Sequence, residues 1–453
     1  MTRHFDLAIL GTGSGNSIPT EQMEDWSVAM VEPDTFGGTC LNRGCIPSKM
    51  FVHSADVART IKTAGTFDVA GTFEGVDFAA MRNRVFGRID PIAAGGETYR
   101  RQQPHITVFD QPARFTGAKE LTSGKDTFTA DRIVLAAGSR PFLPPITGLE
   151  DVTVHTSDTI MRLDDLPQRL VIIGGGAVAA EMAHVFDALG SSVTMVLRSD
   201  RLLTIEEPDI GYALTTEFSH RGLQIRPSTK AVSVTRSPGG IDVALDDGST
   251  VQTDVLLVAA GRVSNGDRLA LDVAGIDVDE GNRPVVDEYM RTTVEGIWAL
   301  GDLEAHHHDL KHVANAHAKA IRHNVMNPER PIRPVLPNQP RATFTDPEVA
   351  SVGLLESEAR AQGHNVVVGQ REYGATAYGW ALEDTKSFAK VVVDADSRLI
   401  LGGHIIGPMA SILVQTLVQG MTFGQTAEEL ATGMVWPHPA LTEVIEQALL
   451  AAP

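Results

Sequence analysis

The stretch Phe5-Asp-Leu-Ala-Ile-Leu-Gly-Thr-Gly-Ser-Gly-Asn16 runs from a short apolar segment into a glycine-rich turn, and a second apolar segment, Val28-Ala-Met-Val-Glu32, follows it. This order predicts a strand, a phosphate-binding loop, a helix and a parallel strand, which together form a βαβ dinucleotide-binding unit. The order recurs in Leu170-Val-Ile-Ile173, Gly174-Gly-Gly-Ala-Val-Ala-Ala-Glu181 and Val193-Thr-Met-Val-Leu197. The chain therefore contains two predicted dinucleotide-binding folds of the α/β class.

The first glycine loop has the residues that a pyrophosphate site needs. Gly11 and Gly13 let the backbone approach the phosphates, and the helix that follows presents free N–H groups to them. Glu32 lies 21 residues after Gly11, where a carboxylate can hold the two hydroxyls of a ribose. The third glycine of the pattern is replaced by Asn16, with an extra glycine at Gly15. We therefore expect a slightly looser contact between this helix and its strand.

The second loop places Gly174, Gly176 and Ala179 at the three key positions. Its second strand ends in Leu197-Arg198-Ser-Asp-Arg201 rather than in an acidic residue. No carboxylate is available there to bind the two hydroxyls of a ribose, whereas the arginines could bind a 2′-phosphate. The sequence therefore favours NADPH over NADH. The alternative is that Arg198 and Arg201 are surface charges on a turn.

Composition excludes several classes of function. A chain of 453 residues is too long for one hydrophobic core, so several domains are expected. A formal charge of −19 opposes binding to nucleic acid. No apolar run is long enough to span a bilayer and the N-terminus lacks the pattern of a secretory signal, so we expect a cytoplasmic protein without a membrane segment.

The two cysteines of the chain stand close together in Gly37-Gly-Thr-Cys40-Leu-Asn-Arg-Gly-Cys45-Ile-Pro-Ser-Lys49. Five residues of ideal helix rise about 7.5 Å, which exceeds the usual Cα separation of a disulfide, so the helix start must be distorted, and Gly44 permits this. A cysteine in the first turn of a helix has its thiolate favoured by the helix dipole. We expect a redox-active pair; two buried thiols, half of a zinc site or a static disulfide are the alternatives.

Near the C-terminus, Trp436-Pro-His438-Pro-Ala-Leu-Thr-Glu443 combines a histidine with a carboxylate. Pro439 suits the first position of a helix, which leaves His438 just outside it and Glu443 one turn inside. The carboxylate would hold one imidazole nitrogen while the other delivers a proton to a leaving thiol. The alternative is an ordinary surface histidine. The run His306-His-His308 lacks the spacing of a zinc site, and we predict no metal centre.

Taken together, these motifs resemble the pyridine nucleotide-disulfide oxidoreductases, which include glutathione reductase, dihydrolipoamide dehydrogenase and mercuric reductase. The resemblance covers essentially the whole chain and also rests on Ala136-Ala-Gly138 and Gly301-Asp302. It implies that the first fold binds FAD, that the second binds the nicotinamide nucleotide, and that electrons pass through FAD to Cys45, which leaves Cys40 as the outward thiol. It further implies a homodimer in which His438 and Glu443 reach the partner subunit's cysteines, and a Lys49–Glu181 pair near the flavin. The cofactor contacts expected on this basis are Gly11, Gly13, Gly15, Asn16, Glu32, Gly38, Thr39, Lys49, Gly138, Asp302, Gly174, Gly176, Ala179, Glu181, Arg198, Arg201 and Gly261.

The resemblance also suggests domain boundaries. Residues 1–155 and 265–335 would form the two parts of the FAD-binding domain, and residues 156–264 the NADPH-binding domain. Residues 336–453 would form an α+β dimerisation domain, which follows a stretch from Asn327 to Pro340 that contains five prolines.

Several short sequence stretches outside the shared motifs resemble one branch of the family, whose substrate is a sugar-bearing, low-molecular-weight disulfide. These stretches lie at residues 11–17, 85–92, 95–101, 155–158, 261–265 and 378–384, and Ala440 also resembles that branch. A dihydrolipoamide dehydrogenase would instead prefer NAD, and a metal-ion reductase would need a further cysteine pair that this sequence lacks. A redox sensor without small-disulfide turnover is the alternative outside enzymology, and it would not need the acid His438.

Overall fold

The structure is a computed structural model that describes residues 2–305 and 309–453. It contains two compact units, which are described separately below. The first unit comprises Met1–Ser48, Arg82–Phe142 and Gly261–Leu336, and the second comprises Lys49–Met81, Leu143–Ala260 and Pro337–Pro453. The second unit thus holds most of the predicted NADPH-binding and dimerisation segments.

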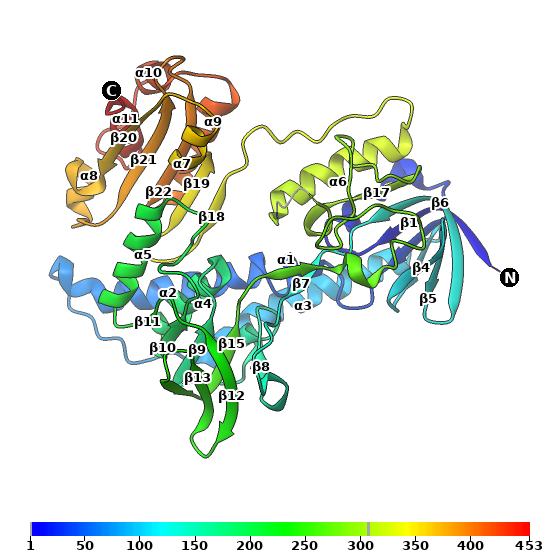
Figure 1. Cartoon of the computed structure of the whole chain (residues 1–453), viewed down its shortest axis with the longest axis horizontal. Coiled ribbons are helices and arrows are strands. Elements are labelled where there is room, and N and C mark those ends of the chain that lie inside the picture. The colour runs from blue at the N-terminus through cyan, green and yellow to red at the C-terminus, as the bar shows by residue number, and fades with distance from the viewer. Residues whose placement is uncertain (1, 306–308) are drawn as a thin grey trace. The chain divides into compact units, whose positions relative to one another are not determined.

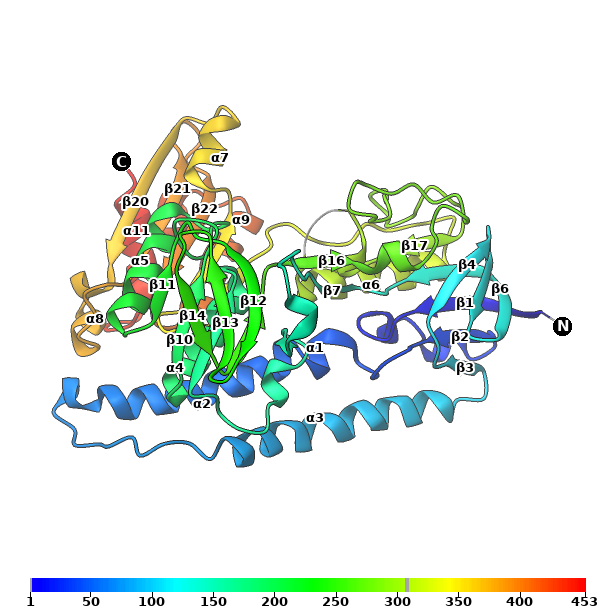
Figure 2. The same ribbon diagram turned by 60° about the horizontal axis from the view of Figure 1, so that its bottom comes forward.

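A seven-stranded sheet forms the centre of the first unit, with the strand order β3-β2-β1-β6-β5-β4 and with β17 paired to β6. Strands β1, β2, β3, β6 and β17 are parallel, and β4 and β5 add an antiparallel edge. Figure 2 shows β1, β2 and β3 side by side. Apolar side chains such as Leu7, Ile9 and Val134 are fully buried in its core. The bounds are Arg3–Leu10 (β1), Val28–Val31 (β2), Ile106–Phe109 (β3), Ala113–Gly117 (β4), Glu120–Ser123 (β5), Asp126–Leu135 (β6) and Ile297–Ala299 (β17).

The segment between β1 and β2 corrects the sequence-based expectation of a helix. It contains only two three-residue 3₁₀ turns, η1 (Gly15–Ser17) and η2 (Glu21–Met23). Pro19 lies between them, and a proline inside a helix removes one backbone donor and clashes with the preceding turn. The first glycine loop therefore lacks the long helix, and the helix dipole, that the βαβ pattern led us to expect.

The first unit has few helices among its described residues. The short helix α1 (Gly38–Asn42) precedes α2 (Cys45–Thr63), and α3 (Phe78–Arg101) runs toward β3. Both α2 and α3 belong in part to the second unit. Helix α6 (Lys311–Met326) follows β17, and β7 (Ser139–Pro141) pairs with β16 (Arg262–Ser264).

The second unit contains a parallel five-stranded sheet with the order β11-β10-β9-β15-β8, which carries the second glycine loop. The loop joins β9 to α4, as the sequence predicts. A three-stranded antiparallel sheet, β12-β13-β14, packs on it through Val234, Val243 and Leu256. The bounds are Val154–His155 (β8), Arg169–Ile173 (β9), Ala177–Leu189 (α4), Ser192–Val196 (β10), Pro208–His220 (α5), Gln224–Arg226 (β11), Ala231–Ser237 (β12), Gly240–Leu245 (β13), Thr250–Thr253 (β14) and Val255–Val258 (β15).

The C-terminal part of the second unit is an antiparallel sheet with the order β18-β19-β22-β21-β20. Figure 1 shows it in yellow and orange with α9 and α11 against it. Its core joins strand residues such as Val391 to Leu417 of α9 and Val444 of α11. The bounds are Arg341–Thr343 (β18), Val349–Gly353 (β19), Glu356–Ala361 (α7), Val366–Glu372 (β20), Ala377–Ala381 (α8), Phe388–Asp394 (β21), Ile400–Ile406 (β22), Ala410–Thr422 (α9), Ala427–Thr432 (α10) and Thr442–Leu450 (α11).

The remaining short elements are 3₁₀ turns. They are η3 (Ala64–Phe67), η4 (Leu149–Asp151), η5 (Ile160–Arg162), η6 (Asn265–Arg268), η7 (Gly301–Leu303) and η8 (Tyr373–Ala375). Among the described residues, no helix combines the length and the apolar character that crossing a membrane requires.

Candidate active site

The two cysteines lie on separate helices. Helix α1 ends at Asn42, the chain leaves helical geometry at Arg43 (φ −151°), and Cys45 begins the 19-residue helix α2. This break is the distortion that the spacing of the cysteines requires. Gly44 allows it by lacking a side chain, because a Cβ atom there would lie 3.0 Å from the carbonyl oxygen of Thr39.

Both cysteines are free thiols in this structure, Cys45 exposed and Cys40 partly buried. Their side chains are hydrogen-bonded, and this bond raises the pKa of Cys40, with further contributions from burial and from repulsion by Cys45. The positive charge of Lys311 acts in the opposite direction and lowers the pKa of Cys40. The hydrogen bond, burial and the repulsion from Cys45 together outweigh the charge of Lys311, so the pKa of Cys40 lies above that of an ordinary thiol.

This result refines the expectation that a helix start favours the thiolate. The dipole effect requires a helix of some length and acts within its first turn. Helix α1 has five residues, whereas Cys45 stands at the start of α2. The helix dipole thus favours a negative charge at Cys45 more than at Cys40.

The first glycine loop forms a cradle of bare backbone. Gly11 has a left-handed φ of +109°, and a Cβ atom there would lie 2.3 Å from the carbonyl oxygen of Ala136. A Cβ atom on Gly38 would lie 2.7 Å from the Cα atom of Gly13. The loop therefore packs directly against the start of the cysteine segment, where Thr39 follows Gly38. Such close approach of backbone is what a bound diphosphate requires.

The helix–strand contact that we expected Asn16 to loosen is absent from the structure. There is no long helix to pack, and a Cβ atom on Gly15 would lie 2.9 Å from the Cβ atom of Ala136. The buried Arg100 also fixes Asn16, because its Nε atom donates to Asn16 Oδ1 at 2.8 Å and its terminal amino group donates to the Asn16 carbonyl oxygen.

The carboxylate of Glu32 organises the same loop. Glu32 Oε2 accepts hydrogen bonds from Thr12 N at 2.9 Å and from Thr12 Oγ1 at 2.6 Å. Its other oxygen accepts from Asp34 N at 3.1 Å. The side chain is only partly buried, at the end of β2, where the sequence predicts a ribose contact.

Asp302, in the turn η7 after β17, is hydrogen-bonded to the first residue of β7. Asp302 Oδ2 accepts from Ser139 Oγ at 2.8 Å and lies 3.9 Å from Arg262 Nε. Gly138, beside Ser139, has a φ of +64° and no heavy atom within 4 Å of the position of a Cβ atom. Gly261 stands just before β16 with a φ of +123° and is equally open.

The second glycine loop has the geometry that its sequence predicts. A Cβ atom on Gly174 would lie 2.2 Å from the carbonyl oxygen of Ala259, and Gly176 is the N-cap of α4. Ala179 is fully buried in α4. The two arginines after β10 differ in their surroundings. Arg198 is exposed, whereas Arg201 pairs with Asp200 at 3.2 Å and its guanidinium lies 5.3 Å from the ring centre of Tyr212.

A partly buried ion pair joins α2 to α4 in the second unit. Lys49 Nζ donates to Glu181 Oε2 at 2.5 Å, and Glu181 Oε1 accepts from Phe344 N at 3.0 Å. The Lys49 ammonium also lies 4.3 Å from the ring centre of Phe344. The predicted Lys49–Glu181 pair is therefore present in the structure, and Phe344 is a contact that the sequence pattern did not indicate.

His438 and Glu443 form the expected hydrogen bond, although the helix starts later than predicted. Helix α11 begins at Thr442, so Pro439 precedes it by three residues instead of being its first residue. His438 Nδ1 lies 2.9 Å from Glu443 Oε1, and Glu443 Oε2 accepts from Ala440 N at 3.1 Å. The bond to His438 lowers the pKa of Glu443. The imidazole is 70% exposed, so its second nitrogen is open to another molecule.

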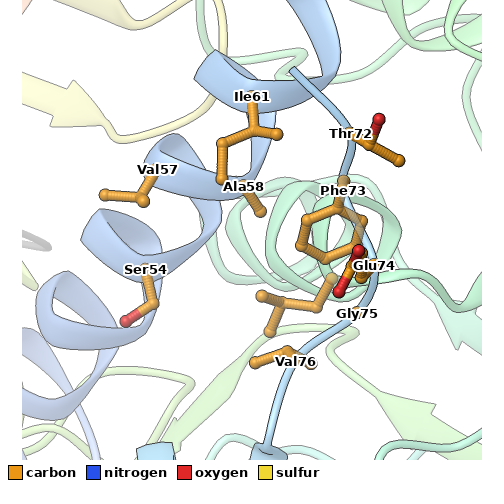
Figure 3. Close-up of a pocket in the computed structure, with 10 residues that line it drawn as sticks. Ser54, Val57, Ala58, Ile61, Thr72, Phe73, Glu74, Gly75 and Val76 are labelled. Atoms are coloured by element: carbon orange, nitrogen blue, oxygen red, sulfur yellow. The ribbon is translucent and has the colours of Figure 1, made fainter.

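Two other features do not extend the site. Among the described residues, no cluster of three or more His, Cys, Asp or Glu side chains could hold a metal ion. The run from His306 to His308, for which we predicted no metal role, lies outside the described residues. A pocket of about 310 Å³ between α2 and residues 72–76 is lined mainly by apolar side chains and contains no predicted site residue (Figure 3).

Sequence reasoning missed a polar cluster behind the first glycine loop. Lys311 Nζ donates to Ser14 Oγ at 2.8 Å, and Ser14 Oγ lies 3.2 Å from Asn315 Oδ1. Ser14 belongs to the glycine loop, whereas Lys311 and Asn315 lie one turn apart on α6. No local pattern identifies these residues, because 297 positions separate Ser14 from Lys311.

Comparison with known proteins agrees with this geometry. Residues 5–320 match the family described as pyridine nucleotide-disulphide oxidoreductase, and residues 339–449 match the dimerisation domain of the same family. The chain is 45% identical to a mycothione reductase of Mycobacterium tuberculosis, over 98% of this chain and 99% of the relative. It is 31% identical to a dihydrolipoyl dehydrogenase of Bacillus subtilis, over 100% and 98%. The solved flavoprotein disulfide reductase RclA of Escherichia coli shares the fold, with a TM-score of 0.86 at 24% identity over 98% of this chain and 99% of that one.

Proposed function

Because this chain belongs to the pyridine nucleotide-disulphide oxidoreductases, we propose that it is an NADPH-dependent enzyme that reduces mycothione, the disulfide of mycothiol, to two thiols. The observation that carries the disulfide chemistry is the pair of hydrogen-bonded thiols, Cys40 and Cys45, at the break between α1 and α2. The choice of mycothione rests on the relative that is 45% identical over nearly the whole length of both chains.

The residues of the first unit suit FAD. The bare backbone of Gly11, Gly13 and Gly38 leaves room for a diphosphate, and Glu32 lies at the end of β2 for a ribose. Asp302 would contact the flavin side chain. When bound, FAD supplies a carrier that accepts an electron pair from a nicotinamide nucleotide and delivers it to a disulfide.

The protein's own groups would perform the thiol chemistry. Reduction of the Cys40–Cys45 disulfide breaks the S–S bond with two electrons and one proton, and leaves one thiol and one thiolate. Cys40, as a thiolate, attacks the substrate disulfide, forms a mixed disulfide and releases the first thiol. Cys45 then attacks Cys40 in this mixed disulfide, which releases the second thiol and restores the Cys40–Cys45 bond.

We further propose a homodimer in which the partner subunit's His438 serves this dithiol. The match of residues 339–449 to the family's dimerisation domain supports a dimer. His438 would give its proton to the departing thiol, while Glu443 holds the imidazole through Nδ1. Because a dithiol that works with NADPH needs a reducing compartment, a cytoplasmic location is part of this proposal.

The exposed Arg198 is our candidate for recognising the 2′-phosphate of NADPH. Replacing it with Ala removes one charge-assisted hydrogen bond, and we expect the KM for NADPH to rise roughly tenfold or more. The KM for NADH should stay unchanged, because that nucleotide carries no 2′-phosphate. Arg201→Ala is the matched comparison, and we expect a smaller effect because Arg201 is already paired with Asp200. Steady-state rates with both nucleotides check this, and equal effects on NADPH and NADH would remove Arg198 from the site.

The contact between Gly38 and Gly13 provides a test of the FAD site. In Gly38→Ala the new Cβ atom meets backbone, and a φ of +63° disfavours any side chain by about 1–2 kcal/mol. We expect the purified variant to lose most of its flavin, measured as the ratio of absorbance at 450 and 280 nm after dialysis. Gly87→Ala in α3 is the control, because no atom lies within 4 Å of its Cβ position. Full flavin content in Gly38→Ala would show that the cradle is not part of the site.

The function itself is tested by measuring NADPH oxidation with mycothione, glutathione disulfide and lipoamide in parallel, and again with NADH. A clear preference for mycothione with NADPH supports the proposal. If the enzyme instead turns over lipoamide with NAD(H), the conclusions on the fold and the dithiol stand, but the enzyme is a dihydrolipoyl dehydrogenase. NADPH oxidation that is independent of all three disulfides would favour a redox sensor.

A further inference from the structure

A short segment of the second unit connects the candidate 2′-phosphate site to a buried cluster of charges. This segment, residues 198–206, follows β10 and ends just before α5, and we call it the arm. It begins with the exposed Arg198. Further along, Leu203 N donates to the carbonyl oxygen of Gly175 in the second glycine loop at 2.8 Å. The arm therefore links the glycine loop to the arginine that is our candidate for the 2′-phosphate.

The backbone of the arm is strained at Leu203. Its φ of +49° lies in the left-handed region, which residues with a side chain avoid. Such a conformation persists only where the surrounding contacts hold it. On one side this contact is the bond to Gly175. On the other side is the buried Glu206, whose N–H donates to the carbonyl oxygen of Leu203 at 2.9 Å. Groups that fix Glu206 thus help to keep Leu203 on the glycine loop.

Two cations of the C-terminal sheet hold this end of the arm. Arg341, in β18, donates from Nε to Glu206 Oε1 at 2.8 Å and from a terminal amino group to the carbonyl oxygen of Ile205 at 3.1 Å. Lys390, in β21, donates from Nζ to Oε2 of Glu207, the residue after the arm, at 3.0 Å. The conformation of the arm therefore depends on side chains from a different part of the second unit.

Lys390 is the centre of a buried cluster of charges. Besides its bond to Glu207, its Nζ atom lies 3.4 Å from Asp209 Oδ2 and 3.1 Å from Glu356 Oε2, and its side chain is only 9% exposed. Burial lowers the pKa of Lys390, but its hydrogen bonds and the neighbouring carboxylates outweigh this, so the pKa lies above its usual value. Removing the ammonium would leave buried carboxylates without their partner, which is strongly unfavourable.

A second ion pair between the same parts of the chain offers a comparison. Helix α5 packs against β22 of the C-terminal sheet (Figure 2). Lys386, just before β21, donates from Nζ to Glu217 Oε1 at 2.7 Å. Because Glu217 lies near the C-terminal end of α5, this pair also attaches the helix to the sheet, but at the end remote from the arm.

We propose that Arg341 and Lys390 are positioning residues for NADPH, which hold the arm in the conformation that places Arg198 at the 2′-phosphate. This inference rests on the proposed function, in which Arg198 recognises that phosphate. It gives the part of the chain that matches the family's dimerisation domain a second role, in the choice between NADPH and NADH.

The test measures the binding of NADP⁺ and of NAD⁺ to the oxidised, flavin-loaded enzyme by calorimetry, so it needs no disulfide substrate. The variants are Arg341→Met and Lys390→Met, with Lys386→Met as the matched control. Flavin content and thermal unfolding show whether each variant is folded. Should the loss of the buried Lys390 prevent folding, Arg341→Met decides, because the Arg341 side chain is 35% exposed.

In Arg341→Met and Lys390→Met we expect the Kd for NADP⁺ to rise about threefold to tenfold, because a misplaced guanidinium loses part of its charge-assisted hydrogen bonding. The Kd for NAD⁺ should stay at its wild-type value, and Lys386→Met should change neither. The KM values for NADPH and NADH should divide in the same way. Added to Arg198→Ala, Arg341→Met should weaken NADP⁺ binding by less than about twofold, since both changes act through one contact.

Three results would overturn the proposal. They are an equal loss of NADP⁺ and NAD⁺ binding, the same loss in Lys386→Met, and wild-type binding of NADP⁺ by folded Arg341→Met. Full additivity of Arg341→Met with Arg198→Ala would also contradict it, because the cation would then act independently of Arg198. Failure of the proposed function has a different signature, since the wild-type enzyme itself would then bind NADP⁺ no more tightly than NAD⁺.

Discussion

Cys40→Ser should abolish disulfide turnover while NADPH still reduces the bound flavin. Serine keeps the size of the side chain but is a far weaker nucleophile, and the disulfide that receives the electrons no longer exists. We expect turnover of mycothione to fall by at least about 10³-fold, as when an essential nucleophile is removed from other enzymes. Stopped-flow bleaching at 450 nm follows flavin reduction, and NADPH consumption follows turnover.

Measuring flavin reduction and disulfide turnover separately makes this result specific. Loss of both would mean that the variant is misfolded or lacks flavin, which the absorbance ratio of the purified protein detects. The chain has only two cysteines, so thiol titration of the denatured variant should find one. Turnover that survives in Cys40→Ser would contradict the assignment of Cys40 as the thiol that attacks the substrate. Cys45→Ser should also lose turnover, but its remaining Cys40 should still be alkylated.

The second large effect is expected for His438→Gln. General acid catalysis by a positioned side chain is worth about 10²–10⁴-fold, and glutamine preserves a polar group without the proton. Turnover of mycothione should therefore fall by about 10²-fold or more, while flavin reduction by NADPH is unchanged. The matched control is His364→Gln, which removes another histidine–carboxylate contact, at 3.0 Å to Asp394, from the same C-terminal domain. A loss of less than about twofold in His438→Gln would mean that water supplies the proton.

The lowered pKa of Glu443 predicts that the contribution of this carboxylate does not change with pH in the neutral range. Because its hydrogen bond with His438 lowers its pKa, the carboxylate stays ionised throughout the range above its usual value near 4.5. The benefit that Glu443 gives to His438 is thus fully present at neutral pH and is lost only as the pH falls through the lowered pKa. Glu443→Gln should therefore reduce turnover by a constant factor between pH 6 and 9. A loss confined to one end of this range would contradict the orienting role.

Sequence patterns predicted the elements whose cause is local. Glycines at 174 and 176 followed by an uninterrupted apolar helix pattern correctly indicated the β9–loop–α4 unit. The same reasoning was wrong after Gly15, where Pro19 overrides the expected helix. It also placed the start of α11 three residues too early, because a proline permits a helix start without requiring one.

The rest of the site depends on contacts between distant segments. Nothing near Lys311 in the sequence indicates that it meets Ser14, and Phe344 meets Glu181 across 163 positions. The pairing of His438 with Glu443 was predictable because five residues separate them. Long-range polar contacts of this kind carry no periodicity, and only the folded chain brings them together.

The break between α1 and α2 also has a mechanical consequence for the catalytic cycle. Opening a disulfide lets two sulfur atoms move apart from a bond of about 2.05 Å to a non-bonded separation, and the ease of this movement depends on how firmly each cysteine is held. Cys45 is anchored in 19 residues of continuous helix, whereas Cys40 rides on a helix of five residues that ends at the Arg43–Gly44 joint. Fewer helical hydrogen bonds therefore hold the backbone of Cys40 than that of Cys45, and under the proposed function Cys40 is the sulfur that has to reach the substrate.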